Sequence, residues 1–103
     1  MEKDYEVKKD GSVLTIVLGT SLSTQNAPAL SEELAQYKDQ GVEEVVFDAT
    51  RLTHLTSSGV RVIIFCKQKL SSKPKIVIVN CSNEILDIFD IVGLRKFLTF
   101  ENK

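Results

Sequence analysis

The sequence predicts an α/β fold with a central mixed β-sheet. Two short, continuous apolar runs, Val45–Phe47 and Ile76–Val79, are typical of strands buried on both faces of a sheet. Helix-like segments alternate with strand-like segments from Ser12 onward, which favours parallel strands joined by right-handed crossovers. We therefore expect about four to five strands with helices, arranged as an N-terminal β-hairpin followed by alternating β-α units.

The opening hairpin is predicted from strand-like segments at 5–9 and 12–18. Between them stands Asp10-Gly11, a dipeptide favoured in type I′ turns because both central positions need positive φ. The next segment has the period of a helix, with apolar residues at Ala27, Leu30, Leu34 and Tyr37. We expect Asn26 to be its N-cap and Gly41 to end it.

The second half of the chain predicts two further β-α units. Residues 42–48 read as a strand before an apolar helix, and 76–79 as the next strand. Ser82 is expected to cap a short helix that Gly93 ends, and 97–100 to form a last strand. The apolar positions of that helix form its expected buried face: Ile85, Leu86, Ile88, Phe89 and Val92.

Composition indicates an ordinary globular domain spanning residues 1–103. The hydrophobic fraction is 43%, the charged fraction is 26% and the net charge is −1. No dense cluster of Lys and Arg indicates nucleic-acid or membrane binding, and no apolar run is long enough for a membrane helix. We therefore expect a cytoplasmic protein. Cys66 and Cys81 lack the spacing of a metal or redox pair and are expected to be reduced, structural thiols.

Three consecutive hydroxyl residues, Thr56, Ser57 and Ser58, precede Gly59 at the predicted start of the second helix. One Ser or Thr suffices to cap the free N–H groups of a helix, so a run of three suggests a regulatory site. The simpler interpretation of Ser57 is a helix cap without a regulatory role. A Ser–His hydrolase is disfavoured because His54 lies in the same short loop and no Gly-x-Ser-x-Gly turn is present.

The order of elements, together with this motif, resembles the STAS domain of bacterial anti-sigma factor antagonists. In that family an Asp-Ser-Ser-Gly-Leu-Gly pattern opens a helix, and a partner kinase phosphorylates its first Ser. Residues 56–60 occupy the pattern here, and the segments 22–30 and 91–97 also match, so the resemblance covers essentially the whole chain. It implies phosphorylation at Ser57, with Ser58 and Thr56 as alternatives. Two acidic residues of the family pattern are replaced, by Thr56 and by Ser23.

The resemblance implies a protein that acts by binding rather than by catalysis. Its unphosphorylated form would bind an anti-sigma factor with serine kinase activity, and phosphorylation would weaken this binding. We nominate seven residues as the partner-binding surface: Ser23, Thr24, Thr56, Ser57, Ser58, Arg61 and Phe65. The alternative is an interaction scaffold that has lost the switch, which the two replaced acidic residues motivate.

Several single residues have more than one possible role. Phe65 is either part of the core or a contact residue, and Arg61 is either a contact or a solvated helix charge. Asp87 and Asp90 share a helix face but lack a third ligand, so no metal is expected. We expect no cofactor, no nucleic acid and no membrane among the partners, and a free protein that is monomeric.

Overall fold

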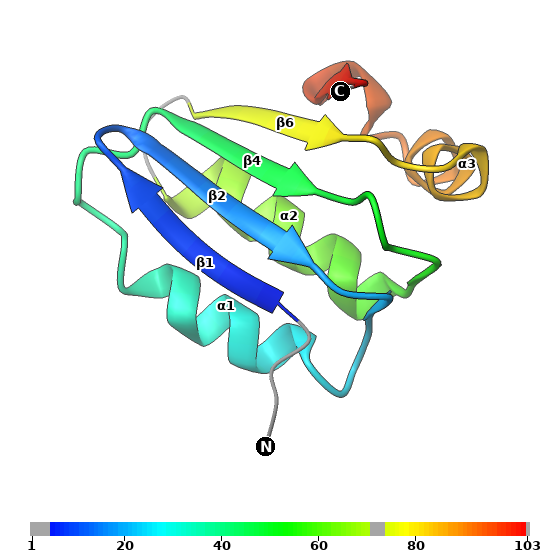
Figure 1. Cartoon of the computed structure of the whole chain (residues 1–103), viewed down its shortest axis with the longest axis horizontal. Helices are drawn as coiled ribbons and strands as arrows, with labels where there is room; N and C mark the ends of the chain where they lie inside the picture. Colours follow the sequence, from blue (N-terminus) through cyan, green and yellow to red (C-terminus); the bar gives the residue numbers. More distant parts are fainter. Residues whose placement is uncertain (1–4, 71–73, 103) are drawn as a thin grey trace.

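The computed structural model describes residues 5–70 and 74–102, and they form a five-stranded mixed sheet in the order β1-β2-β4-β6-β7. β1 runs antiparallel to β2, and every other neighbouring pair is parallel. The predicted α/β fold with an opening hairpin is therefore confirmed (Figure 1). The strands are β1 (Tyr5–Asp10), β2 (Val13–Leu18), β4 (Glu44–Asp48), β6 (Lys75–Val79) and β7 (Thr99–Glu101).

The hairpin turn lies one residue later than the sequence suggests. Asp10 pairs directly with Val13, so the two-residue loop is Gly11-Ser12 rather than Asp10-Gly11. Gly11 has a φ of 62°, whereas Asp10 and Ser12 do not have positive φ. A glycine with positive φ at the first central position fits a type II′ turn, so the expected type I′ turn is wrong.

Three helices pack beside the sheet: α1 (Ala27–Ala35), α2 (Ser57–Lys69) and α3 (Asn83–Ile91). α1 and α2 lie next to each other behind the sheet, and both begin at the end where β2, β4 and β6 finish (Figure 1). α1 is shorter than predicted, because turns replace the helix after Ala35 and Gly41 does not end it. Tyr37, expected on the helix, still packs against the core from these turns.

The C-terminal region differs most from the prediction. Ser82 caps α3 as expected, its Oγ accepting a hydrogen bond from Ile85 N at 3.2 Å, and Gly93 follows with a φ of 76°. Val92 is exposed, because it follows the end of α3. Phe97, predicted to start the last strand, instead ends a 3₁₀ helix, η1 (Arg95–Phe97). The last strand, β7, starts at Thr99.

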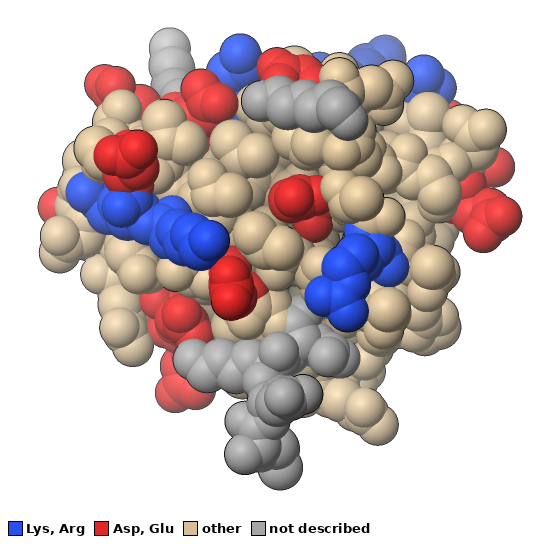
Figure 2. All heavy atoms as spheres, in the orientation of Figure 1, with Lys and Arg blue, Asp and Glu red and all other residues tan. Residues whose placement is uncertain are grey.

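The main core lies between the sheet and α1 and α2, where alternate strand residues meet apolar helix residues. The other face of the sheet lies toward the viewer in Figures 1 and 2; no helix of the described residues covers it, and it carries scattered charges of both signs. Cys66 lies in the core, where burial raises the pKa of its thiol to about 12. No helix in the described part of the chain has the length and apolar character needed to cross a bilayer.

Candidate functional site

Two short strands that the sequence did not predict build the frame of the site. β3 (Ser21–Leu22) and β5 (His54–Leu55) pair in parallel, apart from the main sheet. The backbone N–H of Thr56 extends this contact by donating to the carbonyl of Leu22 at 3.1 Å. The pairing joins the loop that leads into α1 to the loop that leads into α2, although about 30 residues separate them in sequence.

Gly59 allows α2 to start against this small sheet. A Cβ atom at Gly59 would lie 2.6 Å from the carbonyl oxygen of Leu22 and 2.6 Å from a methyl group of Leu55. Neither atom leaves room for a side chain, because ordinary contacts begin at 3.4 Å. The glycine of the hydroxyl motif therefore has a packing role that fixes the first turn of α2.

The three hydroxyl residues occupy three different environments. Thr56 is the N-cap residue by position, but its side chain caps no N–H group, and its buried Oγ1 has no hydrogen-bond partner among the described residues. Ser57 is the first residue of α2 and is exposed, and its hydroxyl makes no hydrogen bond within the described ranges. Ser58 is half-buried. The interpretation of Ser57 as the N-cap is therefore wrong, and its hydroxyl remains accessible.

Ser23 and Thr24 lie in the loop before α1, and Asn26 organises this loop. Its Oδ1 accepts from Ser23 N at 2.8 Å, and its Nδ2 donates to the carbonyl of Ser21 at 2.8 Å. Asn26 is the N-cap residue of α1 by position, as expected, but its side chain bonds within the loop and makes no capping hydrogen bond to the helix. Sequence reasoning missed this role, although Asn side chains commonly bond to nearby backbone in turns.

A hydrogen bond joins the loop to the start of α2. Thr24 Oγ1 and Ser58 Oγ lie 3.2 Å apart, so the nominated residues Thr24 and Ser58 are in contact. Beside this bond a groove of about 200 Å³ runs between the two helices. Among the described residues, both helices line the groove: Ala27, Pro28 and Ser31 from α1, and Ser58, Arg61 and Val62 from α2.

Arg61 and Phe65 lie farther along α2 than the three hydroxyl residues, and Arg61 lines this groove. It is exposed and makes no ion pair with the described residues. Phe65 is half-buried and packs against the hydrophobic core, which agrees with the interpretation of Phe65 as part of the core. It does not line the groove among the described residues.

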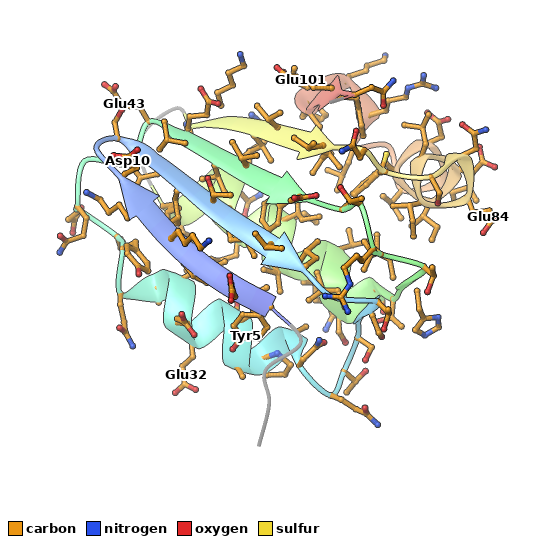
Figure 3. All side chains as sticks on the ribbon, viewed as in Figure 1. Tyr5, Asp10, Glu32, Glu43, Glu84 and Glu101 are labelled. Carbon is orange, nitrogen blue, oxygen red and sulfur yellow. The ribbon has the colours of Figure 1, made fainter. Side chains whose placement is uncertain are left out.

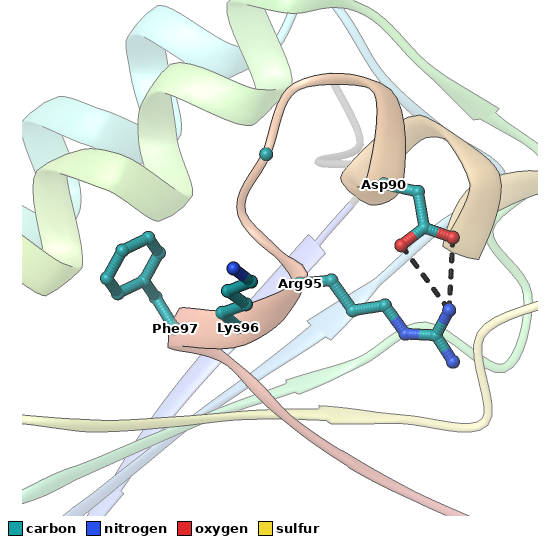
Figure 4. Close-up of a pocket in the computed structure, with 5 residues that line it drawn as sticks. Asp90, Arg95, Lys96 and Phe97 are labelled. Carbon is teal, nitrogen blue, oxygen red and sulfur yellow. Dashed lines mark hydrogen bonds and ion pairs between the residues drawn. The ribbon is translucent and has the colours of Figure 1, made fainter.

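The remaining candidates from the sequence lie apart from this arrangement. His54 is exposed on β5, and no hydrogen bond joins its side chain to a serine in the described part of the chain. Asp90 pairs with Arg95 at 3.1 Å, beside a separate open hollow of about 610 Å³ that Phe97 also lines (Figure 4). Asp90 therefore neutralises a neighbouring cation.

Comparison with known proteins identifies the family. The STAS domain profile matches residues 4–103, so the chain belongs to the STAS domain family. BtrV of Bordetella bronchiseptica, a protein named as an anti-sigma factor antagonist, is 29% identical over 96 residues, which cover 92% of this chain and 82% of BtrV.

Solved structures agree on the fold. One described as an anti-sigma factor antagonist of Thermotoga maritima superposes with a TM-score of 0.83 at 13% identity, covering 96% of this chain and 86% of that one. The phosphorylated form of the Bacillus cell fate determinant SpoIIAA gives a TM-score of 0.74 at 18% identity, covering 93% and 89%. At these identities the agreement concerns the fold alone.

Proposed function

We propose that this protein is an anti-sigma factor antagonist that binds an anti-sigma factor and thereby regulates transcription. BtrV is named an anti-sigma factor antagonist and aligns with most of the chain. The protein would act by binding rather than by catalysis, as a single cytoplasmic domain that is monomeric when free. It would need no cofactor, nucleic acid or membrane.

The observation that carries this proposal is the exposed position of Ser57 at the start of α2 in a STAS domain. Its hydroxyl is exposed at the first position of α2 and is not engaged by the rest of the described chain. A kinase needs such an accessible hydroxyl. We propose that the anti-sigma factor is itself the serine kinase and phosphorylates Ser57, with Ser58 and Thr56 as less suitable sites because both are half-buried.

Phosphorylation at this position can act without unfolding the domain. A phosphate adds about −1.5 to −2 charges, and the N-terminus of a helix stabilises negative charge by about 0.3–1 kcal/mol when exposed. A partner that covers Ser57 would instead have to desolvate this charge, which costs several kcal/mol when no cation pairs with it. The modification would therefore change the contact surface and leave the fold intact.

The partner-binding surface that we propose contains Ser23, Thr24, Thr56, Ser57, Ser58 and Arg61. The loop before α1 and the first turns of α2 carry all six, and the pairing of β3 with β5 connects these segments. Phe65 has a smaller part in this proposal, because it packs against the core and does not line the groove.

A second candidate function is an interaction scaffold without the switch. Thr56 and Ser23 favour it, because the family pattern has acidic residues at these positions and a kinase could use them. Both candidates predict binding, but only the first predicts that phosphorylation controls it.

The test is a pull-down from lysate of the native host with wild type, Ser57→Ala and Ser57→Asp, followed by mass spectrometry. We expect wild type and Ser57→Ala to retain an anti-sigma factor that Ser57→Asp loses. Incubation of the purified pair with labelled ATP should label wild type and leave Ser57→Ala unlabelled. Equal retention by all three forms without labelling would favour the scaffold, and absence of any anti-sigma factor would refute the proposed function.

A further inference from the structure

The loop before α1 and the first turns of α2, which carry the proposed binding surface, contain no carboxylate, and neither do the longer segments around them. Residues 11–31 carry no charged side chain at all, and residues 49–70 carry two Arg and two Lys but no Asp or Glu. All 14 acidic residues of the chain therefore lie outside these segments. Figure 3 shows Asp10 and Glu43 at the opposite end of the sheet from the start of α2, and Glu84 on α3. The overall charge of −1 conceals this local difference.

Arg61 is the charged group best placed to meet a partner. It is the only charged residue among the described residues that line the groove between α1 and α2, next to Ala27, Pro28 and Val62. It is exposed, and no described carboxylate pairs with it. Because Arg61 follows Ser57 by four positions in α2, the two side chains share one side of the helix.

An unpaired guanidinium beside an apolar groove restricts what can bind there. A partner that covers Arg61 without offering acceptors would leave a desolvated charge, and a basic partner would add repulsion. The planar guanidinium binds carboxylates in a two-pronged geometry, so an acidic side chain is the matching group. This inference rests on the proposed function: we propose that the anti-sigma factor presents an acidic surface to this site, with a carboxylate that pairs with Arg61.

This pairing would also strengthen the switch. A phosphate on Ser57 would lie within one turn of Arg61 and would compete with the partner carboxylate for the same guanidinium. It would in addition repel that carboxylate directly. An acidic partner is therefore displaced by phosphorylation for two reasons, whereas a basic partner would be attracted by the new charge.

The test uses the anti-sigma factor that the pull-down identifies, purified and titrated against Arg61→Glu by calorimetry. The matched control is Lys38→Glu, which makes the same change in charge at an exposed position after α1, at the other end of that helix. We expect Arg61→Glu to weaken binding by about tenfold or more, and Lys38→Glu by less than about twofold. Circular dichroism melts of both variants check that each is folded.

Two further measurements identify the sign of the partner surface. The association rate of wild type should fall as salt is raised, and that of Arg61→Glu should fall less steeply. Replacing the contacting partner carboxylate by Arg should restore binding of Arg61→Glu. Unchanged or tighter binding by Arg61→Glu would refute the acidic surface and leave the proposed function standing, whereas failure of wild type to bind any anti-sigma factor would overturn both.

Discussion

Replacing Gly59 by Ala should displace the start of α2 from the small β3-β5 sheet. The new Cβ would lie 2.6 Å from the carbonyl oxygen of Leu22, about 0.8 Å closer than the 3.4 Å at which ordinary contacts begin. That oxygen already accepts a hydrogen bond from Thr56 N, so it cannot move without weakening the bond that holds the two loops together. The methyl group of Leu55 is equally close and nearly buried.

The expected loss of stability follows from two opposing contributions. Overpacking in a filled site costs about 1–3 kcal/mol, whereas Ala in place of Gly within a helix returns up to about 1 kcal/mol. Three contacts shorter than 3.0 Å place the overpacking cost in the upper part of that range, about 2–3 kcal/mol, so we expect the free energy of unfolding to fall by about 1–2 kcal/mol. For a domain of this size that lowers Tm by very roughly 4–16 °C.

Urea unfolding followed by circular dichroism measures this change, with Ser57→Ala as the control. Ser57 is exposed on the same turn, so its replacement should change stability by no more than about 0.5 kcal/mol. Gly59→Ala should also weaken partner binding, because Ser57 and Ser58 move with the helix start. A Gly59→Ala variant as stable as wild type would show that the close contact does not constrain α2.

Three further predictions concern other parts of the fold. Asn26→Ala removes the two hydrogen bonds that the Asn26 side chain makes within the loop and should lower the free energy of unfolding by about 1–2 kcal/mol in urea, whereas Gln25→Ala, exposed beside it, should have little effect. Ser82→Ala removes the α3 cap and should lower the free energy of unfolding by about 1 kcal/mol; no change would mean that the cap bond is replaced by water. Burial raises the pKa of Cys66 to about 12, above its unfolded value near 9, so the free energy of unfolding should fall as pH rises from about 9 toward 12. Burial also shields this thiol from reagents, so a thiol reagent at pH 8 should label half-buried Cys81 first and Cys66 only in denaturant.

The sequence predicted the parts of the fold that depend on strong local patterns. The apolar runs in β4 and β6 and the Ser82 and Gly93 signals of α3 give strands and a helix close to those predicted. It failed at β3 and β5, because two-residue strands have no periodicity and form only through pairing across about 30 residues. The displacement of the hairpin turn by one residue has a similar cause. Two ways of pairing β1 with β2 agree with the apolar pattern of the sequence, and only the pairing in the folded chain decides between them.

At the site, the sequence predicted which residues gather but not how each is held. Thr24 and Ser58 were both nominated, and their hydroxyl groups lie 3.2 Å apart. The roles of Asn26 and Gly59 could not be derived from sequence, because each depends on a neighbour brought close by the fold. The sequence also did not decide which hydroxyl residue precedes the helix, since three candidates stand in a row.

The placement of Thr56 bears on whether the switch operates. An acidic residue at this N-cap position would accept hydrogen bonds from the first N–H groups of α2 and place a negative charge beside Ser57. Thr56 does neither, because its side chain caps no N–H group and is uncharged. The N-terminus of α2 is therefore left to stabilise an incoming phosphate without a competing carboxylate. The exchange of acid for Thr therefore removes a group that a kinase could use, which favours the scaffold, but it also makes a phosphate on Ser57 easier to accommodate. A working switch would depend on the partner to supply the acidic group that Thr56 lacks.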